Sequence, residues 1–341
     1  MQAAVISLQT GVAGVSLLVD PSDLATVSSS VREIFSGVPQ GALWSPCLWD
    51  FDISDLPSAV EFGELLCYAD DLSLWYEITD ENKDVVLDRI NADLASLLVW
   101  GDGNRTTFEP TKTYSMLVSL KRSGKFNGLD RLCMDGKHIK EVSQMKLVGF
   151  DFDSKLTWGP MVDRLAKKAR CKLGAIRRLK QYLDIPNLKL MYTAFVRSGL
   201  EYGNVLYMGA AESHLLKLDR IQKSAQALGG FEVESLQSRR DAACLKLGCK
   251  LLAGQGRGSL DAFAPSLVSV QARSRHQVGG LQIVMPVAPS KYPLECFRRS
   301  FLYRLPEIWS SAPQSLVLKC ESSSWCKLPG VLKRAGHFSV S

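Results

Sequence analysis

The feature that most constrains the fold is a pair of adjacent aspartates between two apolar runs. Asp70 and Asp71 follow residues 65–67 and precede residues 72–76, and both runs are rich in apolar and aromatic side chains. Two such runs separated by so few residues predict a β-hairpin with the aspartates near its tip. Neighbouring ionised carboxylates repel each other, and a bound divalent cation relieves that repulsion. The pair is therefore a candidate magnesium site, and the alternative is an ordinary solvated turn.

A second turn lies about thirty residues upstream, where two glycines enclose Val-Pro-Gln at positions 37–41. The glycines allow a shaped turn at which backbone can approach a ligand closely. The Gln40 amide offers both a donor and an acceptor to a nucleotide base. Residues 37–48 read G-x-P-Q-G-x-x-x-S-P-x-L, and Y-A-D-D follows at 68–71. Together these motifs resemble the palm of a reverse transcriptase, and they most resemble the non-LTR (LINE, jockey-like) retrotransposon group.

Four further segments resemble that group and stand in the same order along the chain. They are the lysine-bearing segment 108–113, the LG-hydrophobic-D segment 146–153, the LEYG segment 200–204, and the F…W stretch 301–313. The resemblance therefore covers most of the chain from about Gly37 onward. The first two motifs are specific for the resemblance when taken together, whereas the later segments mainly confirm the order along the chain.

The resemblance implies two-metal phosphoryl transfer, in which two Mg²⁺ ions activate a primer 3′-hydroxyl and stabilise the leaving pyrophosphate. Asp70 is expected to be the main metal ligand, and Asp71 a supporting ligand. The partners it implies are an RNA template and a DNA primer.

Other residues have roles in nucleotide and template binding by the same resemblance. Tyr68 is expected near the primer end, and Lys112 near the triphosphate. Lys112 has an alternative interpretation as an exposed lysine that opens a strand. The residues expected to line the nucleotide and template pocket are Pro39, Gln40 and Gly41.

The chain departs from this resemblance upstream of the Pro-Gln-Gly turn. Reverse transcriptases carry a further metal-bridging aspartate there, in a D-x-x-x-A-[FY]-D segment that this sequence lacks. Asp20 follows an apolar run, but it lies only 17 residues before Gly37, where the family has several tens. By the same resemblance, fingers and an endonuclease domain are not expected within this sequence. The resemblance thus predicts a truncated polymerase, and the alternative is a catalytically inactive nucleic-acid-binding remnant.

Charge is distributed unevenly along the chain. Residues 1–100 contain 3 Lys and Arg against 16 Asp and Glu, a net charge of −13, whereas the remainder contains 38 against 19, a net charge of +19. An acidic half joined to a basic half suits a metal-using enzyme of nucleic acids, because the basic half can contact phosphates. Ordinary variation along solvated surfaces is the alternative.

A basic amphipathic helix is predicted from residue 158 onward. Apolar residues step by three or four from Val162 to Leu183 and so share one face. Further helices are expected at 187–208, 211–228 and 234–253. We interpret the region as a thumb that follows the primer–template backbone, although such a face can also belong to a helical bundle or bind membranes or partner peptides. The basic residues of the first helix are Arg164, Lys167, Lys168, Arg170, Arg177 and Arg178.

These patterns predict an α+β fold with four parts. Residues 1–36 remain an unassigned N-terminal segment, 37–157 form a partial palm, 158–254 form a helical thumb, and 255–341 form a loosely ordered C-terminal extension. The palm is expected to be an antiparallel sheet with helices. Its expected elements are a helix at 42–56, a hairpin at 64–78, a helix at 82–100, a strand at 113–119 and a hairpin around 135–136.

The cysteines and the apolar runs indicate the cellular compartment of the protein. The nine cysteines are scattered without a C-x-x-C pair, so reduced buried thiols in an intracellular protein are expected rather than a zinc site. The apolar stretch at 12–19 is short and lacks a basic leader, so neither a signal peptide nor a membrane span is expected. The prediction is a protein of the nucleus or cytoplasm that is not secreted.

Overall fold

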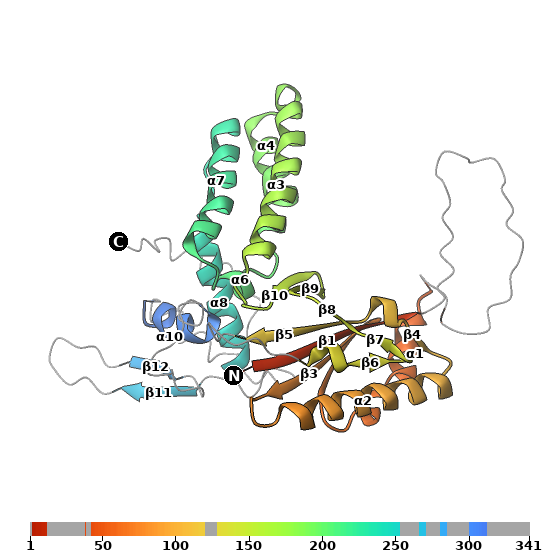
Figure 1. Cartoon of the computed structure of the whole chain (residues 1–341). Coiled ribbons are helices and arrows are strands. Elements are labelled where there is room, and N and C mark those ends of the chain that lie inside the picture. The colour runs from red at the N-terminus through yellow and green to blue at the C-terminus, as the bar shows by residue number, and fades with distance from the viewer. Residues whose placement is uncertain are drawn as a thin grey trace, which may run out of the picture. The chain divides into compact units, whose positions relative to one another are not determined.

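A computed structural model describes residues 2–11, 38, 42–119, 128–252, 266–270, 280–284 and 300–311 of the chain (Figure 1). The chain divides into two compact units, Met1–Leu156 and Thr157–Ser341. Both strands and helices are present, as the α+β prediction requires.

Unit 1 is built on a mixed sheet with the strand order β2-β3-β1-β5-β8, and β4 also pairs with β1. Every described pairing of this sheet is antiparallel except that of β5 with β8. The strands are β1 (Gln2–Gly11), β2 (Glu64–Tyr68), β3 (Asp71–Ile78), β4 (Thr107–Phe108), β5 (Tyr114–Ser119) and β8 (Lys140–Glu141).

The central strand, β1, comes from the segment that the sequence left unassigned. It pairs with β3 on one side and β5 on the other. Ala4, Val5, Ile6 and Leu8 are all fully buried, because both faces of the strand are covered. A strand buried on both faces reads as a continuous apolar run rather than an alternation, so periodicity cannot distinguish it from a helix. The sequence left residues 1–36 unassigned, and the structure places the strand Gln2–Gly11 from that segment in the middle of the sheet.

Helix α2 (Lys83–Gly103) covers one face of this sheet (Figure 1). Its Leu87, Ile90, Leu94 and Leu97 are fully buried in one core cluster with the β1 side chains Ile6 and Leu8. These four positions recur at three and four residues, the spacing that predicted this helix. The shorter elements before the helix are α1 (Ser45–Asp52) and the 3-10 turn η1 (Leu56–Ala59).

The opposite face of the sheet carries a second core cluster, in which Val5 and Met116 pack with Met145 and Leu147 of a β-hairpin. This hairpin consists of β9 (Gln144–Leu147) and β10 (Phe150–Asp153). A further small hairpin, β6 (Cys133–Met134) with β7 (Lys137–His138), turns at Asp135-Gly136 as predicted. The two 3-10 turns of this region are η2 (Pro110–Lys112) and η3 (Leu129–Arg131).

The described part of unit 2 is mainly helical. Its long helices are α3 (Gly159–Leu179), α7 (Glu212–Gly229) and α8 (Leu236–Leu252). The shorter ones are the 3-10 turn η4 (Lys180–Tyr182), α4 (Ile185–Met191), the π-helical η5 (Tyr192–Arg197), α5 (Ser198–Glu201) and α6 (Asn204–Tyr207). One continuous helix was predicted at 187–208, but Gly203 adopts a left-handed conformation with φ 63° and ends α5 before α6 begins.

Part of the C-terminal extension is well packed rather than loosely ordered. Helix α10 (Phe301–Ser311) buries Leu305, Ile308 and Trp309 against Cys244 and Leu245 of α8. The extension also contributes a hairpin of β11 (Ser266–Val270) with β12 (Gly280–Val284). Across the residues that the structure describes, no helix combines the length and apolar character needed to cross a membrane.

Candidate functional site

The predicted hairpin forms, and the two aspartates take different places on it. Ala69 and Asp70 make the turn, and Tyr68 pairs with Asp71 across it. Ala69 has a φ of 52°, a left-handed conformation that few non-glycine residues adopt. The Trp49 indole of α1 donates a hydrogen bond of 3.2 Å to the Ala69 carbonyl. This contact ties the turn to α1, although the turn itself is exposed.

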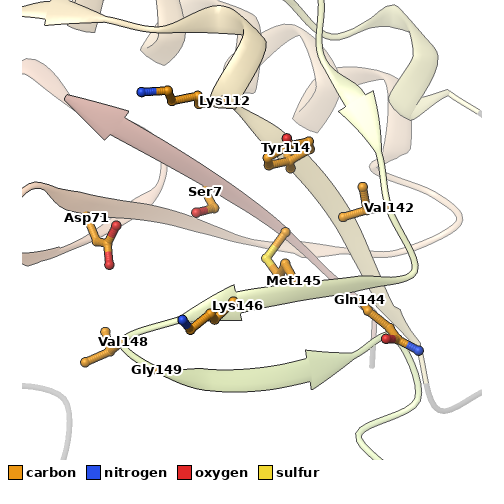
Figure 2. A pocket seen from close by; sticks show the side chains of 10 residues that line it. All are labelled: Ser7, Asp71, Lys112, Tyr114, Val142, Gln144, Met145, Lys146, Val148 and Gly149. Carbon is orange, nitrogen blue, oxygen red and sulfur yellow. The ribbon is translucent and has the colours of Figure 1, made fainter. Parts of the chain in front are cut away.

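Asp71 is half-buried and lines a pocket of about 430 Å³, whereas Asp70 is exposed on the turn and is not among the lining residues. Figure 2 shows the lining side chains. They come from β1, β3, η2, β5, the segment before β9, and the β9–β10 hairpin. The lining residues are Ser7, Asp71, Lys112, Tyr114, Val142, Gln144, Met145, Lys146, Val148 and Gly149.

Strand register brings Ser7 to this pocket. Ser7 pairs with Ser73 of β3, which is two residues from Asp71 and therefore on the same face of the sheet. Ser7 also pairs with Tyr114 of β5. The sequence did not mark Ser7 as a site residue, because its strand was not recognised and only the register places it beside the hairpin.

The pocket carries more positive than negative charge. Its charged side chains are the Asp71 carboxylate and the ammonium groups of Lys112 and Lys146, and both lysines are exposed. Lys112 ends the turn η2, which Glu109 caps by accepting hydrogen bonds from the Thr111 hydroxyl at 2.7 Å and the Thr111 backbone at 3.3 Å. Those bonds lower the pKa of Glu109, the one from the hydroxyl most. Two lysines beside hydroxyl groups suit a bound phosphate better than a lone cation.

The donor set of a two-ion magnesium centre is not assembled among the described residues. No group of three or more His, Cys, Asp or Glu side chains able to hold a metal ion occurs in that part of the chain. Mg²⁺ is often bound by one or two carboxylates, with water and substrate phosphates completing six ligands. Asp71 can supply one such oxygen, but the pocket lining offers no second carboxylate.

The remaining predicted residues are found in several places. Tyr68 is 63% exposed and pairs opposite Asp71 on the edge strand β2. Three residues of the predicted template pocket, together with Asp20, lie outside the described residues. They are Pro39, Gln40 and Gly41.

The predicted basic face of α3 separates into two groups. Arg170 and Arg177 line a groove with α7, where Lys217 and Arg220 join them. The sequence missed the two α7 residues, because it does not state which helix packs beside α3. The other four cations of the prediction lie outside that lining. They are Arg164, Lys167, Lys168 and Arg178.

The LEYG segment has a structural role in unit 2. Leu200 is buried, and its carbonyl accepts a hydrogen bond from the Tyr207 hydroxyl. Glu201 receives both Nε and an Nη of Arg239 at 2.9 and 2.7 Å, which links α5 to α8. This ion pair is the main reason that the pKa of Arg239 is raised.

The chain is similar to polymerases of mobile elements. It is 25% identical over 242 residues to "RNA-directed DNA polymerase from mobile element jockey" of Drosophila melanogaster. This alignment covers 65% of this chain and 25% of that protein. It is 25% identical over 204 residues to "Probable RNA-directed DNA polymerase from transposon BS" of the same species, and 24% identical over 206 residues to the jockey polymerase of Drosophila funebris. Those two alignments each cover 57% of this chain and 22% of the relative.

These similarities identify a reverse-transcriptase-like region in the chain. The chain spans about a quarter of the length of the curated relatives it matches. No protein-family profile matches it, and no solved structure does.

Proposed function

We propose that this chain is part of an RNA-directed DNA polymerase of the non-LTR retrotransposon type. Unit 1 would be a partial palm, and the helices from α3 to α8 a thumb, acting on an RNA template and a DNA primer. One observation carries the proposal: Asp71 begins β3 at the tip of a hairpin and faces a pocket that it shares with Lys112. The similarity to the jockey and BS polymerases supports it.

The charged residues of the pocket and two residues of the adjacent hairpin have roles in this proposal. Asp71 would give one oxygen ligand to Mg²⁺, with water and nucleotide phosphates as further ligands. Asp70, exposed beside it, is the second candidate ligand. Lys112 and Lys146 would neutralise phosphate charge, and exposed Tyr68 offers an aromatic face to the primer end.

A catalytically inactive nucleic-acid-binding remnant is the second candidate. It is favoured by the presence of Ser7, rather than a carboxylate, on the strand next to Asp71. A single pocket carboxylate gives a weak hold on a pair of divalent ions, whose charges repel each other.

Primer extension with the full chain distinguishes the two candidates. The assay uses a DNA primer on an RNA template with Mg²⁺ or Mn²⁺, and compares the parent with Asp71→Asn, Asp70→Asn and the exposed control Asp102→Asn. The polymerase proposal expects extension by the parent and the control, and a loss of at least about 100-fold in Asp71→Asn. Binding of primer–template without any extension supports the remnant, and absence of both contradicts both candidates.

Metal binding can be measured apart from activity. Titration of Mn²⁺ followed by electron paramagnetic resonance should show weaker binding in Asp71→Asn than in the parent. Ser7→Asp adds a second carboxylate on the same face and should tighten binding, with Ser58→Asp as a control on an exposed turn of the same unit. Equal binding by all four proteins would contradict a metal role for Asp71.

A further inference from the structure

Helices α3 and α7 lie side by side within unit 2 (Figure 1). Their side chains line a groove of about 400 Å³. We call it the α3–α7 groove. Its lining residues are Arg170, Leu173, Gly174, Arg177, Lys217, Arg220, Ile221 and Ser224.

The lining residues have the same spacing on both helices. On α3 the lining positions are 170, 173, 174 and 177, and on α7 they are 217, 220, 221 and 224. Each set follows i, i+3, i+4 and i+7, so each forms one stripe along about two turns of helix, roughly 10 Å at 1.5 Å per residue. The groove is therefore elongated along the helices.

The floor of the groove is apolar and its rim is basic. Leu173 and Ile221 are buried, whereas Arg170, Arg177 and Arg220 are exposed. The groove is open at Gly174 on the α3 side, where an added Cβ would meet nothing within 4 Å.

The charge of the groove is only partly neutralised. Lys217 pairs with Asp163 at 2.5 Å. Within the described ranges, no acidic side chain lies at ion-pair distance from Arg170, Arg177 or Arg220. Arginines without acidic partners on both sides of an elongated groove suit a ligand with repeated negative charge, since a guanidinium binds phosphate oxygens in a bidentate manner.

We propose that the α3–α7 groove binds consecutive backbone phosphates of one nucleic-acid strand, without base-specific contacts and without a metal ion. This inference rests on the proposed function and names which part of the predicted thumb contacts the nucleic acid. The groove receives a single backbone, because a groove of about 400 Å³ whose lining extends over roughly 10 Å cannot enclose a duplex, whose major groove alone is about 12 Å wide. Contacts of this kind are electrostatic and independent of sequence.

The test compares two triple variants of the full chain that remove equal charge from the same part of unit 2. The groove variant is Arg170→Gln/Arg177→Gln/Arg220→Gln. The control variant is Lys172→Gln/Lys180→Gln/Lys223→Gln, which takes one exposed cation each from α3, the adjoining turn η4 and α7, all outside the groove and outside the predicted basic face. Circular dichroism and the unfolding midpoint check that both variants fold as the parent does.

Binding of a labelled single-stranded oligonucleotide is measured by fluorescence anisotropy in EDTA at several salt concentrations. The groove variant should bind at least about 10-fold more weakly than the parent, and its slope of log affinity against log salt should fall by about 2, since each lost single-strand phosphate contact removes roughly 0.7. The control variant should stay within about threefold of the parent. RNA and DNA oligonucleotides are tested separately and should show the same difference between variants.

Two results would overturn the groove proposal. One is an equal loss of affinity in both triple variants, which would indicate diffuse attraction over the whole helix surface. The other is displacement of the oligonucleotide by polyglutamate of equal charge at equal concentration, which would indicate an acidic polypeptide as the ligand. Because the assay contains EDTA, absence of primer extension by the parent leaves it unaffected, so failure of the polymerase proposal and failure of the groove are distinguishable.

Discussion

The Tyr76 hydroxyl of β3 donates a hydrogen bond of 2.7 Å to the carboxylate of Asp93 in α2. The same carboxylate, only 1% exposed, accepts bonds from the backbone nitrogens of Glu61, Phe62 and Gly63. One buried side chain therefore fixes the loop that leads into β2 and joins it to both the helix and the sheet. A buried carboxylate is tolerated here because its oxygens are fully hydrogen-bonded.

Loss of the Asp93 carboxylate should destabilise unit 1. Asp93→Ala leaves three backbone donors and the Tyr76 hydroxyl without their acceptor, and we expect a loss of about 3 kcal/mol. Tyr76→Phe removes one bond to a charged group and should cost about 1.5 kcal/mol. Urea unfolding measures both, with the exposed Asp88→Ala as the control, which should stay within about 0.5 kcal/mol. Equal midpoints for Asp93→Ala and Asp88→Ala would contradict this account.

Two glycine substitutions should have opposite effects. A Cβ added to Gly63 would lie 2.7 Å from the Tyr76 hydroxyl oxygen, and the ring cannot retreat because it is buried. Gly63→Ala should therefore cost about 2 kcal/mol through overpacking. Gly174→Ala meets no neighbour and lies inside α3, so it should stabilise unit 2 by about 0.5–1 kcal/mol. Thermal unfolding of the two variants is the measurement. Unfolding midpoints that shift in the same direction in both variants would contradict this prediction.

The pH dependence of unit 2 should include a contribution from Asp241. Burial raises the pKa of its carboxyl above the usual range, and Arg304 at 3.5 Å and Gln237 at 2.9 Å only partly oppose this. A folded-state pKa above the unfolded one means that the contribution of this group to stability is full below about pH 4 and is lost as pH rises through the folded-state pKa.

Asp241→Asn keeps the shape of the side chain and cannot ionise. Its free energy of unfolding, compared with that of the parent, should therefore rise between pH 4 and pH 7. Urea unfolding at both pH values is the measurement, with the exposed Glu232→Gln as the control. A difference between parent and variant that does not change with pH would contradict the prediction.

Thiol labelling should report the docking of α10 on α8. Cys244 is fully buried beside Leu305 and Trp309, and burial raises its pKa to about 12. It should resist a thiol reagent at pH 8 in the folded protein, whereas the exposed Cys171 reacts at once. Mass spectrometry of the modified peptides follows both sites. Trp309→Ala should open the contact and speed the reaction at Cys244 at least about tenfold, while the rate at Cys171 stays unchanged.

Local patterns in the sequence were sufficient to predict the elements marked by apolar runs around a turn or by apolar residues at helical spacing. The β2–β3 hairpin followed from two apolar runs around a short turn, and α2 followed from Ile90, Leu94 and Leu97 at helical spacing. The strand β1 could not be recognised in this way, because burial on both faces removes the alternation.

The sites depend on pairings that local patterns do not contain. Ser7 and Lys146 reach Asp71 only through strand register and through the β9–β10 hairpin. Likewise, Arg170 and Lys167 both lie on the predicted basic face of α3. Only the packing of α7 beside this helix makes Arg170, and not Lys167, a lining residue of the groove. The helical spacing of the α7 cations was visible in the sequence, but their neighbour was not.

The position of β1 in the middle of its sheet affects how unit 1 is made in the cell. Gln2 at one end of that strand bonds to Ser119, 117 residues further along the chain. At roughly 5–20 residues per second, a ribosome needs about 6–23 s to add that length. For this time β1 lacks its neighbour β5, which is still unsynthesised, and we expect nascent chains of this protein to depend on a holding chaperone.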